Sequence, residues 1–300
     1  MVKRLEKRSA RILAILLALI MLGSVFAYIW GGGAREKRET KLSFSTLEAA
    51  AYAPENSFIY YYNLAEYSKL SKKLGKNDSM ISYFEGYFEK EWSYASRYYL
   101  DRRVIEFTHP INEMLVAQYG DYNVYFINEN SSKVYFAKQG ERKVGNLSVK
   151  VSGSIAMVDE VNPLIIGYNP LVLEVLNNFE ENRTAYRNFI SRLNGTYLFS
   201  IMIFGNETGK YVRFSENESP IEFFFEGYRY NESAERYEKV WGIQFTENYF
   251  FSDMNETERG FEYYYFQNFE DGFSLAVMGD KNFTKVLNAR ANVIGIIIRA

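Results

Sequence analysis

Residues 221–251 read IEFFFEGYRYNESAERYEKVWGIQFTENYFF, and this stretch decides the fold because it predicts two neighbouring β-strands. Its two halves, 221–230 and 239–251, are rich in the aromatic and β-branched residues that suit strands. The polar residues 231–233 between the halves are typical of a turn. The stretch therefore predicts an antiparallel pair of strands.

Further strand candidates follow one another closely on both sides of this stretch. They are TYLFSIMIF (196–204), YVRF (211–214), FEYYYFQNF (261–269), FSLAVMG (273–279) and VIGIII (293–298). Nearer the N-terminus, YNVYFIN (122–128) and KVYFAK (133–138) flank a polar turn and predict a hairpin. Residues 146–158 predict two more strands, broken near Gly153. After residue 120 we therefore expect a mostly antiparallel sheet.

Before residue 120 the spacing of apolar residues favours helices. After a strand candidate at 57–63, residues 64–74 carry apolar side chains three and four positions apart, followed by Gly75. A longer helical region is expected from residue 78 to about 107. Pro110 suits the first turn of a further helix, which would end at Gly120.

The expected fold class is an α+β domain with a helical N-terminal part and a mostly antiparallel sheet after residue 120. Residues 163–182 predict a strand and then a helix with Asn169 as N-cap, and shorter helices are expected at 184–193 and around 285–287. The domain is either single or split into two subdomains near residue 120 or 195. A strand, then Asn or Asp, then a short helix recurs at 58–74, 164–178 and 275–288, either by duplication or by chance.

The N-terminal part contains the longest apolar stretch of the chain, ILAILLALIMLGSVFAYIW (12–30). Its length is close to the ~20 residues that cross a bilayer as a helix, and Tyr28 and Trp30 suit an aromatic belt. The alternative is a cleaved signal peptide, with Val25-Phe26-Ala27 as the cleavage site. We therefore expect a basic cytoplasmic tail (1–11), a single transmembrane helix, a stalk (31–41) and an extracellular domain (42–300).

The domain after this stretch is unusually rich in N-glycosylation sequons. Ten occur, where chance predicts roughly 2.6 from the content of Asn, Ser and Thr, and all follow the apolar stretch. The candidate glycosylation residues are Asn77, Asn130, Asn146, Asn182, Asn194, Asn206, Asn217, Asn231, Asn255 and Asn282. They predict a glycoprotein whose C-terminal domain is outside the cell.

Composition narrows the class of protein. Residues 1–41 carry nine basic and three acidic side chains, which leaves 26 basic and 34 acidic ones in 42–300, a net charge of −8. An acidic domain is a poor partner for the phosphate backbone, so nucleic acid is not expected as a partner. The chain has no cysteine, hence no disulfide or thiolate metal site. Many charged residues, few Gln and many sequons together suggest a thermophilic, archaeal-type surface protein.

No motif for catalysis, cofactor binding or metal binding is evident. His109 is the single histidine, and its position before Pro110 favours a role in helix capping or packing. Acidic pairs such as Glu180-Glu181 are too numerous to indicate an active site. A glycosidase that works with two carboxylates remains as an alternative. We therefore expect no cofactor and assign no catalytic or metal-binding residue.

Four aromatic clusters have two interpretations. They are FIYYY (58–62), EFFFE (222–226), NYFF (248–251) and YYYF (263–266). They either form a platform that stacks on sugar rings or face the core of a sheet, and the second interpretation is favoured because aromatic residues are common strand formers.

Two classes of function remain. The first is a single-pass, membrane-anchored glycoprotein of the cell surface without catalytic motif, a structural or interaction module of an archaeal-type envelope. The second is a membrane-tethered carbohydrate- or peptide-binding protein or carboxylate-based hydrolase. Expected partners are the membrane, through residues 12–30, and other envelope proteins or surface glycans. A pocket in which aromatic rings and carboxylates gather would favour the second class.

Overall fold

The computed structural model describes residues 40–129, 134–181, 185–193, 195–211, 220–247, 249–253 and 260–295. The apolar stretch 12–30, most of the stalk and five sequon asparagines (Asn130, Asn182, Asn194, Asn217 and Asn255) lie outside these residues. Within them, no helix is long and apolar enough to cross a membrane. They form an α+β fold dominated by one large antiparallel sheet, which confirms the expected fold class at that level.

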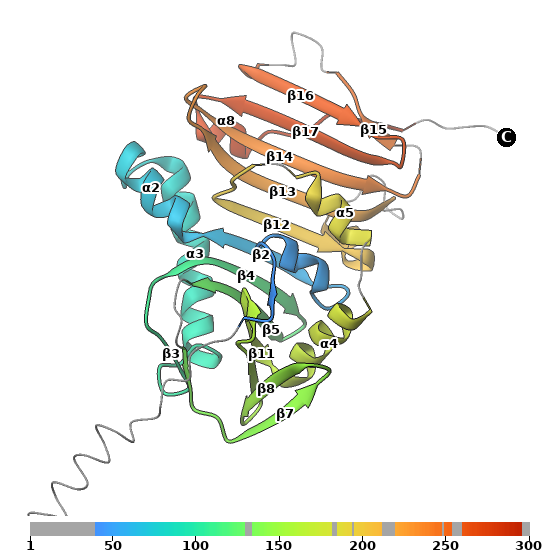
Figure 1. Cartoon of the computed structure of the whole chain (residues 1–300). Coiled ribbons are helices and arrows are strands. Elements are labelled where there is room, and N and C mark those ends of the chain that lie inside the picture. Colours follow the sequence, from blue (N-terminus) through green and yellow to red (C-terminus); the bar gives the residue numbers. More distant parts are fainter. Residues whose placement is uncertain are drawn as a thin grey trace, which may run out of the picture. The chain divides into compact units, whose positions relative to one another are not determined.

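The large sheet has twelve strands, and every neighbouring pair in it is antiparallel. Figure 1 shows it running through the molecule from β16 to β7. In spatial order its strands are β16 (Tyr263–Asn268), β17 (Phe273–Asp280), β14 (Arg236–Phe245), β13 (Ile221–Asn231), β12 (Phe199–Phe204), β2 (Phe58–Asn63), β4 (Ile111–Tyr119), β5 (Tyr122–Glu129), β11 (Leu164–Tyr168), β9 (Ile155–Val158), β8 (Leu147–Ser152) and β7 (Gly140–Val144). The sheet is continuous across residues 120 and 195, where a boundary between subdomains was considered.

Three two-stranded sheets accompany the large one. They pair β1 (Leu42–Ser43) with β10 (Val161–Asn162), β3 (Ile105–Phe107) with β6 (Val134–Phe136), and β15 (Tyr249–Phe251) with β18 (Val293–Gly295).

The predicted strand pair at 221–251 is present as β13 and β14. Their register places Phe224 opposite Ile243 and Phe225 opposite Gly242. Side chains alternate between the two faces of a strand, so Phe223 and Phe225 join one hydrophobic cluster while Phe224 joins the other. All three rings are buried, because both faces of the sheet are covered.

Helices cover both faces of the sheet (Figure 1). One face carries α2 (Leu64–Leu74), α3 (Ser79–Tyr98) and α8 (Phe283–Leu287). The other carries η1 (Glu48–Tyr52), α4 (Asn169–Glu180) and α5 (Ala185–Ser191). Two short turns of helix, η2 (Gly205–Glu207) and α6 (Thr208–Tyr211), follow β12.

The prediction of a helix from Pro110 to Gly120 was wrong, because these residues form the central strand β4. Its apolar residues alternate between the two hydrophobic clusters, with Met114 and Val116 on one face and Leu115 and Ala117 on the other. The helical N-terminal part therefore ends at Tyr98 rather than at residue 120, and residues 105–107, which were expected to be helical, form the strand β3.

Two smaller predictions also need correction. The described part of the predicted strand 133–138 contains β6, which does not form a hairpin with β5, because β4 and β11 flank β5 and β6 pairs with β3 instead. Asn169 is the first residue of α4 rather than its cap; the N-cap is Tyr168, which makes no side-chain capping bond.

Candidate functional site

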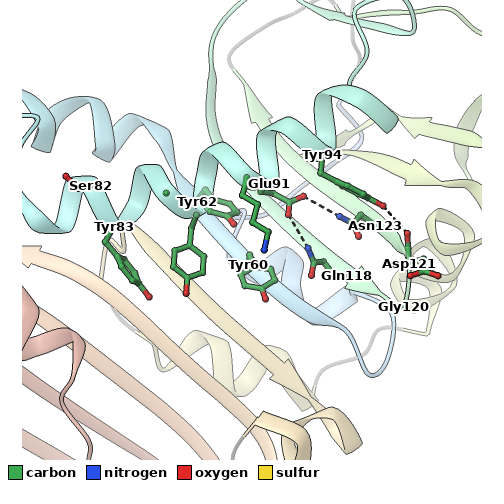
Figure 2. Close-up of a pocket in the computed structure, with 13 residues that line it drawn as sticks. Tyr60, Tyr62, Ser82, Tyr83, Glu91, Tyr94, Gln118, Gly120, Asp121 and Asn123 are labelled. Atoms are coloured by element: carbon green, nitrogen blue, oxygen red, sulfur yellow. Dashed lines mark hydrogen bonds between the residues drawn. The ribbon is translucent and has the colours of Figure 1, made fainter.

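A cavity of about 740 Å³ lies where α3 crosses the strands β2, β4 and β5. Figure 2 shows its lining side chains converging from the helix and from the sheet. Five of the lining residues are tyrosines: Tyr60, Tyr62, Tyr83, Tyr87 and Tyr94. The others are Ser82, Gly86, Lys90, Glu91, Gln118, Gly120, Asp121 and Asn123. We call this the tyrosine cavity.

The two-residue period of strand β2 and the helical period of α3 bring the tyrosines together. Tyr60 and Tyr62 are two residues apart on β2 and therefore point to the same face of the sheet. Helix α3 starts at a cap in which Asp78 accepts hydrogen bonds from the backbone nitrogens of Met80 and Ile81 (2.9 and 3.3 Å). Its buried face packs on the sheet, and its tyrosines stand at the border of that face.

The floor of the cavity is built around Glu91, whose side chain is directed from α3 toward the sheet (Figure 2). Glu91 is only 7% exposed. Its Oε1 accepts hydrogen bonds from Tyr125 Oη at 2.8 Å and from Asn123 Nδ2 at 3.3 Å. Its Oε2 accepts one from Gln118 Nε2 at 3.1 Å. Gln118 and Asn123 face each other across the β4–β5 turn, so the sheet register fixes both donors.

The pKa of Glu91 is raised from its ordinary value. Burial, which disfavours the charged carboxylate, is the largest cause. The three hydrogen bonds and the charge of Lys90 lower it, without cancelling the effect of burial.

The floor offers acceptors to a ligand. A carboxylate has about four lone-pair sites, and among the described residues three donors reach Glu91, two of them on Oε1. One site on Oε2 is left for a ligand. Because the amide groups of Gln118 and Asn123 donate to Glu91, each amide has its carbonyl oxygen left to accept from a ligand.

The walls offer neutral aromatic rings. Burial, together with the neighbouring Tyr87 and Glu91, raises the pKa of Tyr60, so its hydroxyl stays protonated at neutral pH. The rings of Tyr83 and Tyr87 lie 4.9 Å apart, and Tyr87 packs against Phe199 with ring centres 5.2 Å apart. The cavity therefore combines flat apolar walls with hydroxyl groups that can donate.

Within the described part of the chain, none of the candidate glycosylation residues lines this cavity. Among the described ones, Asn77, Asn146 and Asn282 are exposed, and Asn282 caps α8. Asn206 belongs to η2. Asn231 lies at the β13–β14 turn, where its Nδ2 donates to Glu238 and its Oδ1 accepts from Ser233 Oγ and from the backbone nitrogen of Ala234. Glycosylation at all ten positions stays a prediction.

His109 is not part of the tyrosine cavity. It is exposed just before β4, so the predicted helix-start context was wrong, and its Nδ1 lies 3.1 Å from Thr108 Oγ1. It lines a separate depression of about 880 Å³ together with Trp92 and Arg102. Within the described part of the chain, no three His, Asp or Glu side chains gather as a metal site requires.

Three of the four aromatic clusters of the sequence contribute buried core residues, whereas the fourth, 263–266 on the edge strand β16, is half-buried to exposed. Phe223, Phe224 and Phe225 are buried, as is Phe251 of the third cluster. The first cluster has a double role, because Tyr61 packs in the core while Tyr60 and Tyr62 also line the cavity. Glu91 and the tyrosines of α3 were not predicted as site residues, although the spacing of Tyr83, Tyr87 and Tyr94 at four and seven residues is a helical signal.

Comparison with known proteins identifies relatives. The AF_2048_N family N-terminal domain matches residues 45–180, which include every residue that lines the cavity. An uncharacterized protein of Archaeoglobus fulgidus is 43% identical over 302 residues, covering 98% of this chain and 96% of the relative.

Two solved structures of TP0453 show a distant likeness to this chain. Crystal form III covers 79% of this chain and 96% of its own, at 9% identity and a TM-score of 0.32. Crystal form I covers 84% and 94%, at 10% identity and a TM-score of 0.33. At these values the likeness carries no conclusion about function.

Proposed function

We propose that this chain, which belongs to the same family as the Archaeoglobus fulgidus protein, is a membrane-anchored, N-glycosylated surface protein that binds carbohydrate in the tyrosine cavity. The observation that carries the proposal is the cavity itself. Five tyrosine rings surround a buried carboxylate and two side-chain amides in a volume typical of small-ligand sites.

Carbohydrate fits both kinds of surface in the cavity. A sugar ring has an apolar C–H face, which packs on aromatic rings, and a rim of hydroxyl groups, which both donate and accept hydrogen bonds. Glu91 Oε2 and the carbonyl oxygens of Gln118 and Asn123 would accept from sugar hydroxyls. The Tyr60 hydroxyl and the Lys90 ammonium would donate to sugar oxygens.

Peptide is the less suitable ligand. Extended peptides are commonly recognised through backbone hydrogen bonds to an exposed strand edge. The three strands that line the cavity, β2, β4 and β5, each have a strand on both sides, so no edge is open there. Recognition has to come from side chains, which suits a sugar better.

The apolar stretch and the sequons support a site outside the cell. The apolar stretch 12–30 supports a membrane anchor by its length, and the ten sequons, all C-terminal to it, support an extracellular domain. In this arrangement the protein holds a carbohydrate ligand at the membrane surface, as an interaction module of an archaeal-type envelope.

Binding can be tested by calorimetry on the full-length protein in detergent, with oligosaccharides released from the cells' own envelope. Tyr60→Ala should weaken binding about threefold or more through lost ring contact. Glu91→Gln should weaken it about tenfold, since a hydrogen bond to a charged acceptor is lost. Tyr265→Ala, which removes an exposed ring on the edge strand β16, is the matched control and should bind like wild type.

Two results would contradict the proposal. Equal binding by Tyr60→Ala, Glu91→Gln and wild type would show that the cavity is not the site. Binding of a random peptide library, but of no oligosaccharide, would replace the proposed class of ligand.

A specific observation favours hydrolysis as a second candidate function. Glu91 has a raised pKa, as general acids of glycosidases do, and Asp121 lines the same cavity. If the protein hydrolyses the bound oligosaccharide, Glu91→Gln should abolish release of reducing ends. Wild-type protein that binds oligosaccharide without releasing reducing ends would exclude this candidate.

A further inference from the structure

We infer that the bound carbohydrate is an extended chain that lies along α3 and engages Tyr98, beyond the cavity. This inference rests on the proposed function and concerns the length of the ligand and the direction in which it runs.

The first observation is a row of tyrosines along one side of α3. Tyr83, Tyr87, Tyr94 and Tyr98 follow one another at intervals of four, seven and four residues. At 3.6 residues per turn they fall within a sector of about 60°, and at 1.5 Å per residue the row is about 22 Å long. We call this row the tyrosine stripe.

The stripe consists of two ring pairs on either side of the carboxylate. The rings of Tyr83 and Tyr87 lie 4.9 Å apart, and those of Tyr94 and Tyr98 also lie 4.9 Å apart. Lys90 and Glu91 occupy the helical turn between the two pairs. An aromatic platform therefore stands at each end of a polar centre.

The stripe is open to solvent and continues past the cavity. Tyr87 is 41% exposed and Tyr98 is 53% exposed. Tyr94 lines the cavity, whereas Tyr98 lies outside it, so the Tyr94–Tyr98 pair joins the cavity to the surface beyond. Tyr94 Oη donates to the backbone oxygen of Asp121 at 3.0 Å, which holds this pair against the β4–β5 turn (Figure 2).

The length of the stripe decides between a small ligand and a chain. The cavity has the volume of a site for a single small molecule, and such a molecule would leave the Tyr98 ring unused. A chain of sugar units can place one unit in the cavity and a later unit on the Tyr94–Tyr98 pair. Because Tyr98 is exposed, its ring is available to the chain without rearrangement of the core.

The test measures how affinity depends on ligand length. Full-length protein would be titrated with size-fractionated envelope oligosaccharides of two to eight units. In wild type, affinity should rise with length by about three- to tenfold, which corresponds to one added ring contact. Tyr98→Ala should remove this rise and leave the shortest fraction bound as before, whereas Tyr87→Ala should weaken binding of every fraction.

Two further variants complete the design. Tyr98→Phe keeps the ring and should keep the rise with length, and Tyr265→Ala should behave like wild type. Equal affinity of wild type for all lengths, or an unchanged rise in a folded Tyr98→Ala protein, would overturn the inference while the proposed function stands. If wild type binds no fraction at all, the proposed function itself fails.

Discussion

At the scale of single residues, Glu91 is the side chain on which the cavity depends. It joins three donors, Tyr125, Asn123 and Gln118, that belong to β4 and β5, and so it connects α3 to the sheet as well as offering an acceptor to a ligand. A residue with both roles should affect stability and binding together.

Replacement of Glu91 by alanine should destabilise the fold by about 2–3 kcal/mol, because it leaves buried donors without their acceptor. Glu89→Ala, on the exposed side of the same helix, should stay within about 0.5 kcal/mol of wild type. Urea unfolding followed by circular dichroism measures both values. Similar stability of the two variants would show that the network around Glu91 does not stabilise the fold.

The raised pKa of Glu91 also predicts a dependence of stability on pH. The folded state holds this proton more tightly than the unfolded state, in which the group titrates near its ordinary value of 4.5. The stabilisation that comes from tighter proton binding by Glu91 is therefore fully present below pH 4.5 and is lost as the pH rises through the raised folded-state pKa. The difference in unfolding free energy between wild type and Glu91→Gln, measured at each pH, should fall as the pH rises from 4.5 through the folded-state pKa of Glu91. A difference that rises with pH would mean that the pKa is lowered instead.

At the scale of elements, local signals predicted some segments well and others poorly. Helix α2 was predicted with its observed bounds, because its apolar residues are three and four positions apart and Gly75 follows its end. The structure adds that Asn63 caps its start. Strand β4 was taken for a helix because it is buried on both faces, and a continuous apolar run lacks the alternation that marks a half-buried strand. This error hid the site, since only a β4–β5 pairing brings Gln118 opposite Asn123.

The sheet also depends on a buried ion pair that the sequence could not reveal. Lys239 on β14 contacts Glu226 on β13, with 3.1 Å between Nζ and Oε2. Its Nζ also donates to the backbone oxygens of Leu287, the last residue of α8, and of Ala289, just after it (3.1 and 3.4 Å). Glu226 receives the indole N–H of Trp241 as well, so both charges have several partners. The pair thereby links the sheet to the segment after α8.

Lys239→Met should destabilise the fold by about 3–5 kcal/mol, because it leaves the Glu226 carboxylate buried without its cation. The double variant Lys239→Met with Glu226→Gln should recover part of this loss. Lys281→Met is the control, since Lys281 and Glu262 are exposed and 3.9 Å apart, and its effect should stay below about 1 kcal/mol. A Lys239→Met protein as stable as the control would contradict this account.

At the scale of the whole molecule, the sheet repeats one order of strands. The centre of this repeat is the contact between β2 and β12. Outward from it, the strands on one side are β2, β4, β5, β11 and β9, and those on the other side are β12, β13, β14, β17 and β16. The segments 164–178 and 275–288, which share Val-Leu-Asn, both contain the fourth strand of this order and the helix after it. However, α4 packs on one face of the sheet and α8 on the other, so the two halves are not related by a simple two-fold rotation.

The arrangement of the chain at the membrane is the last prediction. We expect residues 1–11 in the cytoplasm, residues 12–30 in the membrane and residues 42–300 outside. The sequons support this orientation more strongly than the flanking charges do, since five Lys or Arg residues precede the apolar stretch and four lie in the stalk after it. Protease added to intact cells should digest the domain and spare an N-terminal epitope tag, and permeabilised cells, as the control, should lose both.

Mass spectrometry of the native protein should recover peptides upstream of Ala27, because an anchor is retained where a signal peptide is removed. A mature N-terminus at Tyr28 would mean that the carbohydrate site is released from the cell rather than held at its surface, and a protected domain would mean that the site faces the cytoplasm.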